Sequence, residues 1–350
     1  MTVSSSTPPR RAPLMSDVAK LAGVSIGTVS NVLNSPAAVR ASTREKVLDA
    51  ISTLGFVPNS TARSLAVGRG TAIGFIAVDL GNSYFLDISR GIEQEADAGG
   101  RRVLLANSDV DLGKQTAHLE LFEQARAAGI VLAPFDGPLD EVRALRRRGT
   151  QVVYVNWPGV EGESCGVVVD EVLGGELSAR HLIEQGRTRL AFIGGPFSLT
   201  AVRDRFEGAS RAVRAASGVT LELITTPKLT VPPGIAVGRE LAGRDARSRP
   251  DGIVSASDAL AAGIVQSLVV EGVRVPEDIA IVGYDDNHFA DSTLLPLSTV
   301  GQPGVEMGHR AMRLLAEEIG TSGDHVHAHQ TVTLSPRLIV RASSSVGALG

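Results

Sequence analysis

Apolar runs alternate with amphipathic helical stretches along the chain from Thr71 onward. A strand, a helix and a further strand in this order are typical of parallel sheets built from βαβ units. The apolar runs form two series, which predict strands over 72–78, 102–106, 129–133 and 151–155, and then over 166–169, 190–193, 221–224, 252–255 and 278–283. Two series of this length favour two doubly wound lobes over one continuous sheet.

The same alternation predicts helices near 84–99, 114–128, 139–148, 174–186, 201–217, 234–245 and 258–272. A last helix over 304–319 and a last strand over 330–340 come late enough in the chain to return to sheets that earlier residues form. A substantial core is expected, since 43% of the 350 residues are hydrophobic.

The residues before the first strand show helical periodicity instead. Ser16 is expected to cap one short helix, and Ser25 to cap a second helix over 26–33. A third helix is expected to open with a capping box at Ser42 and to run to Leu54. Two short helices joined by a tight turn have the spacing of a helix-turn-helix, and a plain helical hairpin is the alternative.

Charge is distributed unevenly between these two parts of the chain. Residues 1–70 hold eight basic and three acidic side chains, a net charge of +5, so the rest carries −9 of the total of −4. A basic surface suits contact with DNA phosphates, and an acidic surface does not. This division indicates that the short N-terminal part binds a polyanion and that the body does not.

Cysteine content and hydropathy indicate the compartment. Cys165 is the single cysteine, so no disulfide can form within the chain, as is usual in a reducing compartment. No stretch reaches the roughly 18 apolar residues of a membrane span, and no apolar run typical of a secretion signal follows the N-terminus. We expect a cytoplasmic protein with no membrane partner, whose residues 1–14 form a disordered arm.

Residues 16–34 read SDVAKLAGVSIGTVSNVLN, and further characteristic segments lie at 56–59, 282–286 and 338–341. On these segments the chain resembles the LacI family of bacterial transcription regulators, over nearly all residues after 14. The resemblance implies a helix-turn-helix DNA-binding domain over 15–58, a hinge helix and linker over 59–70, and an effector-binding and dimerisation domain over 71–341. It also places the protein at the bacterial nucleoid.

The expected fold is therefore α/β, with a small all-α head and a two-lobed body similar to periplasmic binding proteins. Each lobe should contain a parallel, doubly wound sheet. We expect the N-terminal lobe to comprise 71–169 and 299–328 and the C-terminal lobe 170–298 and 329–341. Residues 342–350 are expected to be a disordered tail.

In the family, the first residues of the second helix and one residue a turn later read base edges. Those positions match Ile26, Gly27 and Asn31. Asn31 can hydrogen-bond a base, Ile26 can contact a thymine methyl group or belong to the core of the head, and Gly27 has no side chain. Hydroxyl groups nearby are expected to donate to phosphates, namely those of Ser25, Thr28 and Ser30.

Residues 59–66 resemble the hinge helix of the family, which becomes ordered only on operator DNA. So short a segment is well below the about 12–15 residues that an isolated helix needs. Leu65 matches a leucine that inserts between base pairs in the minor groove, and Asn59 and Arg63 are expected to contact DNA.

Five residues of the body match the family's effector contacts: Phe85, Asn156, Arg203, Ser257 and Asp285. Phe85 would pack on a ligand ring or belong to the core. Arg203 would bind ligand oxygens and Asp285 would accept hydrogen bonds from the ligand, unless the two form a salt bridge with each other. Leu229 stands where a stacking aromatic residue is loosely expected, which favours a sugar over a purine.

The resemblance implies a ligand-responsive regulator, usually a repressor, that binds a pseudo-palindromic operator as a homodimer. A sugar or sugar derivative is the expected effector, and a nucleobase or another small metabolite is the alternative. A solute-binding receptor without a DNA role would fit the body alone.

Signals for an enzyme or a metal site are weak. The sequence contains neither a phosphate-binding GxxxxGK[ST] loop nor a GxSxG nucleophile motif, so neither an enzyme nor a cofactor is expected. His325, His327 and His329 alternate as on one face of a strand and could bind a metal. Because no pattern of Cys, Asp or Glu completes such a site, we expect a solvated edge strand and no metal.

Overall fold

The structure is a computed structural model that describes residues 11, 13–56, 70–135, 140–320 and 327–345. It divides into two compact units, residues 1–70 and residues 71–350, which are called the head and the body below. The expected hinge residues Asn59, Arg63 and Leu65 lie outside the described residues.

The head consists of short helices around a small apolar core. Its elements are α1 (Met15–Ala22), α2 (Ile26–Asn34), a short 3₁₀ helix (Pro36–Ala38) and α3 (Ala41–Leu54). Gly23 lies between α1 and α2 with φ +66°, a left-handed conformation that glycine adopts without strain. The three expected helices are confirmed, and they bury Val18, Val29, Val32, Val47 and Phe56.

Two of the three expected helix caps are wrong. α1 begins one residue before Ser16, and the carboxylate of Asp17 accepts a hydrogen bond from the backbone N–H of Leu14 at 2.8 Å. α3 begins before Ser42, with Arg40 at the cap position and no side-chain cap. A capping motif signals that a helix begins nearby, but neighbouring residues decide its first turn.

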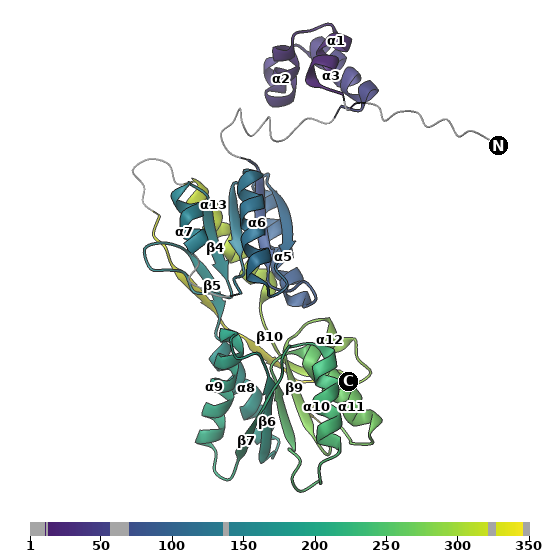
Figure 1. The fold of residues 1–350 in the computed structure, drawn as a ribbon, viewed down its shortest axis with the longest axis vertical. Coiled ribbons are helices and arrows are strands. Elements are labelled where there is room, and N and C mark those ends of the chain that lie inside the picture. Colours follow the sequence, from purple (N-terminus) through teal and green to yellow (C-terminus); the bar gives the residue numbers. More distant parts are fainter. Residues whose placement is uncertain (1–10, 12, 57–69, 136–139, 321–326, 346–350) are drawn as a thin grey trace, which may run out of the picture. The chain divides into compact units, whose positions relative to one another are not determined.

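The first sheet of the body is parallel, with the strand order β11-β5-β4-β3-β1-β2. Its strands are β1 (Ala72–Ala77), β2 (Arg102–Asn107), β3 (Gly129–Leu132), β4 (Gln151–Val155), β5 (Gly166–Val169) and β11 (Thr331–Leu334). Successive side chains of a strand point to opposite faces. Phe75 therefore packs with α5 (Ser83–Ala98) and α13 (Gly304–Gly320), whereas Ile76 packs with α6 (Leu112–Gln124) and α7 (Asp140–Arg147). These elements form the N-lobe (Figure 1).

The second sheet has the order β12-β10-β9-β8-β6-β7, with β12 antiparallel to β10. Its strands are β6 (Arg189–Gly194), β7 (Thr220–Thr225), β8 (Gly252–Ser255), β9 (Ala280–Asp285), β10 (Ser298–Gly301) and β12 (Arg337–Ile339). Phe192 packs with α8 (Glu171–Glu184) and α9 (Thr200–Ala215), and Ile193 with α10 (Val231–Ala242) and α11 (Asp258–Val270). With the short α12 (His288–Asp291), these elements form the C-lobe (Figure 1).

Both sheets have the doubly wound strand order, so ligands are expected near the carboxyl ends of their strands. In the N-lobe, β1 lies between β2 and β3, and in the C-lobe, β6 lies between β7 and β8. The chain reverses its winding direction between β1 and β3 and between β6 and β8. Several polar residues lie at, or shortly after, the carboxyl ends of β1, β4, β8 and β9.

The expected lobe boundaries are wrong for the C-terminal segments that return to the two sheets. Residues 298–301 form β10, which pairs with β9 in the C-lobe, and 331–334 form β11, which pairs with β5 in the N-lobe. The single strand expected over 330–340 is two strands, interrupted at Pro336, which has no backbone N–H to donate to a ladder. The described chain therefore passes between the lobes after β5, after β10 and after β11.

The prediction that residues 342–344 belong to a disordered tail is wrong. Ser343 is fully buried, and its hydroxyl donates to Ile281 O at 2.7 Å and accepts from Ser298 N–H at 2.8 Å. Ser344 is 2% exposed and bonds the hydroxyl of Ser298 at 2.6 Å. These serines satisfy polar groups near the amino ends of β9 and β10, which holds residues 343 and 344 on the C-lobe.

Helices α5 and α13 approach so closely that a larger residue at Gly308 should destabilise the N-lobe. A Cβ atom there would lie 2.1 Å from Ile88 O and 2.8 Å from Ile92 N. We expect Gly308→Ala to lower the free energy of unfolding by about 1–3 kcal/mol, measured by urea denaturation of the full chain. The control is Gly320→Ala on the same helix, where a Cβ meets nothing within 4 Å. Equal stability of the two variants would contradict this packing.

Candidate functional site

Helix α2 of the head has one buried and one exposed face. Val29 and Val32 are buried in the core of the head, whereas Asn31 is exposed. Ile26 is 52% exposed, which places it at the surface of the head and not in its core. A side chain of this kind is free to contact an external partner.

The first turn of α2 is held by its own hydroxyl groups. The Oγ atom of Ser25 accepts a hydrogen bond from the backbone N–H of Thr28 at 3.1 Å and lies 2.9 Å from the Thr28 hydroxyl oxygen. Ser25 is thus the N-cap of α2, as expected. At Gly27, a Cβ atom would meet only the Oγ atom of Ser25, at 3.6 Å, so the backbone is open to close approach there. Ser30 is partly exposed one residue before Asn31.

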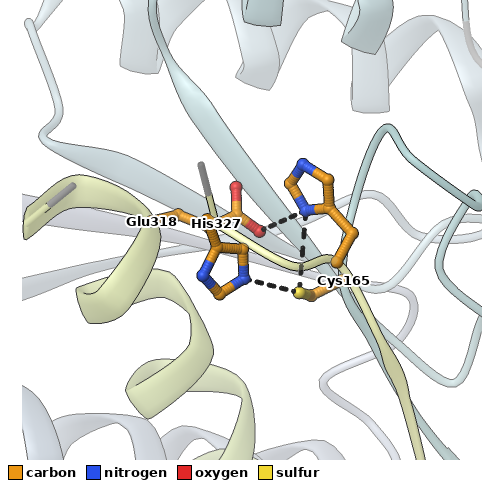
Figure 2. Close-up of side chains that lie close together, drawn as sticks. Cys165, Glu318 and His327 are labelled. Carbon is orange, nitrogen blue, oxygen red and sulfur yellow. Dashed lines mark hydrogen bonds and ion pairs between the residues drawn. The ribbon is translucent and has the colours of Figure 1, made fainter. Parts of the chain in front are cut away.

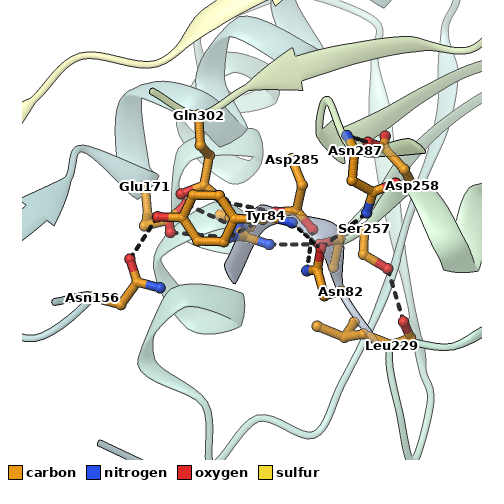
Figure 3. A network of polar contacts seen from close by, with 12 residues as sticks. Asn82, Tyr84, Asn156, Glu171, Leu229, Ser257, Asp258, Asp285, Asn287 and Gln302 are labelled. Atoms are coloured by element: carbon orange, nitrogen blue, oxygen red, sulfur yellow. Dashed lines mark hydrogen bonds and ion pairs between the residues drawn. The ribbon is translucent and has the colours of Figure 1, made fainter. Parts of the chain in front are cut away.

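A buried network of polar side chains in the body is centred on Asp285, the last residue of β9 (Figure 3). Asp285 is 4% exposed. Its carboxylate accepts a hydrogen bond from Asn82 Nδ2 at 2.8 Å and another from Gln302 Nε2 at 2.7 Å. Asn82 belongs to the N-lobe, where it caps α5, so the first of these bonds joins the two lobes.

Further hydrogen bonds join the same two segments across the lobes. Asn287 Nδ2 donates to Asn82 Oδ1 at 3.1 Å, and the backbone N–H of His288 donates to Ser83 Oγ at 3.1 Å. The loop after β1 and the loop after β9 are therefore fastened to each other by side chains that end in amide, hydroxyl and carboxylate groups. A ligand that bonds these groups would change how the lobes meet.

Arg205 is the buried cation beside Asp285. Its guanidinium donates two hydrogen bonds to the carboxylate of Glu171, at 2.8 and 3.0 Å, and lies 3.7 Å from Asp285 Oδ1. It also donates to Ala256 O at 2.6 Å and lies 3.7 Å from the ring centre of Tyr284. Removing this charge from water costs free energy that only such a full set of partners offsets.

Burial also changes the acidity of the carboxyl groups. It raises the pKa of Asp285 to about 6, although the positive charge of Arg205 opposes the increase. It raises the pKa of Asp258 well above the usual value, and the negative charge of Asp285 adds to the effect. Asp258 Oδ1 lies 2.6 Å from the hydroxyl of Thr299, and its Oδ2 accepts from the backbone N–H of Asn287 at 2.9 Å. Asp258 thus orients the loop that carries the cross-lobe contacts.

The structure brings three of the expected effector residues near this network. Asn156, which follows β4, accepts a hydrogen bond from the hydroxyl of Tyr84 at 2.8 Å. Ser257 is 2% exposed, caps α11 and donates to Leu229 O at 3.2 Å. Asp285 is the centre of the network. Their roles toward a ligand stay predictions.

Phe85 and Arg203 are placed differently. Phe85 is 8% exposed and belongs to the apolar core of the N-lobe. Arg203 is exposed, and its guanidinium donates to the carbonyl oxygens of Phe197 and Ser198 and to the Thr200 hydroxyl. Arg203 and Asp285 do not form the salt bridge that was considered for them. The arginine beside Asp285 is Arg205.

Sequence reasoning missed Arg205, Glu171, Asn82 and Gln302. For Arg205 a signal was available on α9, because Val202, Arg205, Ala209 and Ala212 recur at helical spacing and share the buried face. Arg203 lies two positions away, which on a helix is nearly the opposite side. The helical period thus favours Arg205 as the buried arginine.

The prediction that His327 and His329 lie on a solvated edge strand is wrong. Both are partly buried in the segment that precedes β11, beside Cys165 and Glu318. His325 lies outside the described residues. Cys165 was missed because it approaches the histidines only through the pairing of β5 with β11, and Glu318 because it reaches them from helix α13.

Comparisons with known proteins agree with this architecture. The family model described as bacterial regulatory proteins, lacI family, matches residues 14–59, and that of a periplasmic binding protein-like domain matches residues 179–344. The ribose operon repressor of Escherichia coli strain K12 is 32% identical over 341 residues, which cover 94% of this chain and 99% of the relative. The chain belongs to the LacI family.

Solved structures of transcriptional regulators resemble this chain over most of its length. The transcriptional regulator CelR in complex with cellobiose has a TM-score of 0.68 at 31% identity, covering 95% of this chain and 100% of its own. A LacI family regulator from Enterococcus faecium with bound ribose has a TM-score of 0.69 at 25% identity, covering 78% of this chain and 98% of its own. The expected head and two-lobed α/β body are confirmed.

LacI-family membership makes this chain a regulator of transcription, and the relatives named above are regulators and not enzymes. Among the residues that the structure describes, no helix has the length and apolar character needed to cross a membrane.

Proposed function

We propose that this protein is a cytoplasmic repressor that binds a pseudo-palindromic operator as a homodimer and responds to a sugar or sugar derivative. Operator contact is assigned to the exposed face of α2, through Ile26, Gly27 and Asn31. Further DNA contacts are assigned to the hinge residues Asn59, Arg63 and Leu65, with Leu65 inserting into the minor groove.

The head is suited to DNA by charge and by the exposed face of α2. Residues 1–70 carry a net charge of +5, which a homodimer doubles at the operator. Asn31 offers an amide that can bond an adenine edge, and Ile26 offers an apolar surface for a thymine methyl group. Ser25, Thr28 and Ser30 supply hydroxyl groups for phosphates. One head reads too few bases to be specific, whereas two heads related by two-fold symmetry read two half-sites.

The observation that carries the effector proposal is the hydrogen bond between Asn82 and Asp285 across the lobes. A small ligand that replaces this bond with its own changes the contact between lobes, and through it the arrangement of the N-lobes in a dimer. Gln302 donates to Asp285 through its Nε2 atom. Its Oε1 atom is buried and has no hydrogen-bond partner among the described residues. An unused acceptor at this place suits a hydroxyl donor from a ligand.

A sugar fits this set of groups better than a flat aromatic ring. Asp285, Asn82, Asn156 and Gln302 supply a carboxylate and amide groups, which match a ring of hydroxyls that both donate and accept. Leu229, near Ser257, offers an apolar surface without an aromatic ring on which a base could stack. Cellobiose in CelR and ribose in the Enterococcus faecium regulator are precedents among similar structures.

Selection of genomic fragments by the full-length protein, followed by gel shifts at two salt concentrations, tests the DNA proposal. We expect a fragment with an inverted repeat to be shifted specifically and with a stoichiometry of two chains. If no fragment is shifted specifically, with or without cell extract, the operator proposal is overturned and a receptor without a DNA role is favoured.

A thermal-shift screen of sugars and nucleobases tests the effector proposal. A ligand present at about 100 times its dissociation constant stabilises the folded state by about 2.7 kcal/mol, a readily measured increase in melting temperature. The ligand should also change the gel shift of the selected fragment. Stabilisation by a nucleobase alone would overturn the sugar assignment and leave the DNA proposal intact.

Effector affinity is expected to fall below pH 6. The buried Asp285 has a pKa of about 6, so its carboxylate is ionised at pH 7.5 and able to accept hydrogen bonds from ligand hydroxyls, and it becomes protonated as the pH decreases. For a ligand that requires the ionised form, affinity falls about tenfold for each pH unit below the pKa. Calorimetric titrations between pH 7.5 and pH 5 measure this dependence.

The control is Asp285→Asn, which keeps the shape of the side chain and cannot ionise. It should bind the effector more weakly than the wild type at pH 7.5, with an affinity that does not change down to pH 5. A wild-type affinity that is constant over this range would show that Asp285 does not accept hydrogen bonds from the ligand.

A further inference from the structure

Four potential metal ligands meet at the amino end of two paired strands of the N-lobe (Figure 2). Cys165 precedes β5, and His327 and His329 precede β11. Because β5 and β11 run parallel with Gly166 opposite Thr331, the residues before each strand lie side by side. Glu318 reaches the same place from the last turn of α13.

The distances suit a tetrahedral metal ion. The Sγ atom of Cys165 lies 3.1 Å from His327 Nε2 and 3.8 Å from His329 Nδ1, and His329 Nδ1 lies 3.5 Å from Glu318 Oε1. One ligand atom of each residue lies within 4.8 Å of the others. Zinc bonds of about 2.0–2.3 Å at tetrahedral angles place ligand atoms about 3.3–3.8 Å apart. Shifts of less than about 1 Å would therefore complete the coordination shell.

A buried oxygen atom of Glu318 gives a second argument, because Oε1 makes no hydrogen bond within the described part of the chain and lies only in ion-pair range of His329 Nδ1, at 3.5 Å. Glu318 is 4% exposed. The other oxygen, Oε2, is held by Arg146 Nη1 at 3.0 Å. A buried carboxylate oxygen without a hydrogen bond is costly, and a cation at the cluster would satisfy it.

The surroundings of the cluster set the conditions for coordination. Burial raises the pKa of the Cys165 thiol to about 11, and the backbone N–H of Gln330, which donates to Sγ at 3.4 Å, opposes this increase, so a bound cation has to displace the thiol proton. Arg146 fixes Glu318 and also donates to Val152 O at 2.9 Å. Coordination through His329 Nδ1 puts the ring proton on Nε2, so the present 3.4 Å approach of Arg146 Nη2 to that atom has to open.

We propose that Cys165, Glu318, His327 and His329 bind one Zn²⁺ ion in tetrahedral geometry. A thiolate and a carboxylate balance the two positive charges, and a set of sulfur, nitrogen and oxygen ligands is typical of zinc. The ion ties the end of α13 and the approach to β11 to the start of β5. The zinc site lies at the amino ends of the strands, whereas the Asp285 network lies near the carboxyl ends. The two sites are therefore distinct.

Titration of the full-length, untagged and chelator-treated protein with Co²⁺, as a coloured substitute for Zn²⁺, tests the proposal. We expect one Co²⁺ per chain, intense visible absorption typical of a tetrahedral site, and a near-ultraviolet band from sulfur-to-cobalt charge transfer. Because Cys165 is the single cysteine of the chain, that band reports this residue alone. Added Zn²⁺ should displace the cobalt and abolish the colour.

Variants separate coordination from simple hydrogen bonding. Cys165→Ser should abolish the charge-transfer band, and His327→Ala, at a partly exposed position, should weaken Zn²⁺ binding about 100-fold while the circular dichroism spectrum stays unchanged. The control is His309→Ala, which removes a histidine of α13 that pairs with Glu95, and it should bind Zn²⁺ like the wild type. No saturable binding at one equivalent, cobalt binding without the sulfur band, or unchanged affinity in His327→Ala would each overturn the proposal.

Discussion

Replacing Arg205 by alanine is expected to lower the free energy of unfolding of the body by about 3–5 kcal/mol. The guanidinium is buried, and the substitution removes two hydrogen bonds to Glu171 together with the positive charge beside Asp285. Both carboxylates would then be left in a low-dielectric environment without a compensating cation. An uncompensated buried charge strongly lowers the free energy of unfolding. Urea denaturation of the full chain, followed by circular dichroism, measures the loss.

Arg203 provides a matched control on the same helix. Its guanidinium is exposed and bonds loop oxygens, so Arg203→Ala should cost less than about 1 kcal/mol. If both variants unfold at the same urea concentration as the wild type, the buried network around Arg205 does not contribute to stability as described. A loss of effector binding in Arg203→Ala with normal stability would instead support its expected contact with the ligand.

Asn31→Ala is expected to reduce affinity for the selected operator by about 30-fold or more. A side-chain contact that discriminates a base is worth about 1–3 kcal/mol, and a homodimer on two half-sites loses it twice. Non-specific DNA should be bound as before, because phosphate contacts depend on the unchanged charge of the head. Fluorescence anisotropy with the operator and with a scrambled duplex, at one salt concentration, measures both affinities.

The control variant is Ser52→Ala, an exposed substitution on α3 that should leave both affinities unchanged. An equal loss on operator and scrambled DNA in Asn31→Ala would point to a damaged head rather than a lost base contact. An unchanged operator affinity would remove Asn31 from the set of base-reading residues.

The regular elements of the body could be predicted because their signals are local. Continuous apolar runs mark β1 and β4 to within a few residues, since burial of a strand between two layers of helices demands apolar residues along its length. Ser25 identified the start of α2, because a side-chain cap bonds the backbone only three residues away.

Short edge strands and chain ends were harder to predict. β10 has only four residues, and the late strand separates into β11 and β12, which belong to different lobes. Nothing local distinguishes a strand that pairs at the edge of one sheet from one that pairs with another. Ser343 likewise has a polar side chain typical of a solvated tail, yet it is buried because it satisfies the backbone of β9.

The sequence alone determined the basic head, the cap of α2, the two series of strands and helices, and the family to which they correspond. Only the tertiary structure decided which distant side chains meet: Asn82 with Asp285 across the lobes, Arg205 rather than Arg203 beside that carboxylate, and Cys165 with His327. Periodicity and caps arise from interactions within a turn or two of the chain and can therefore be recognised from neighbouring residues. The polar network and the proposed zinc site depend on the register of paired strands and on the contact between lobes, which link residues more than 150 positions apart.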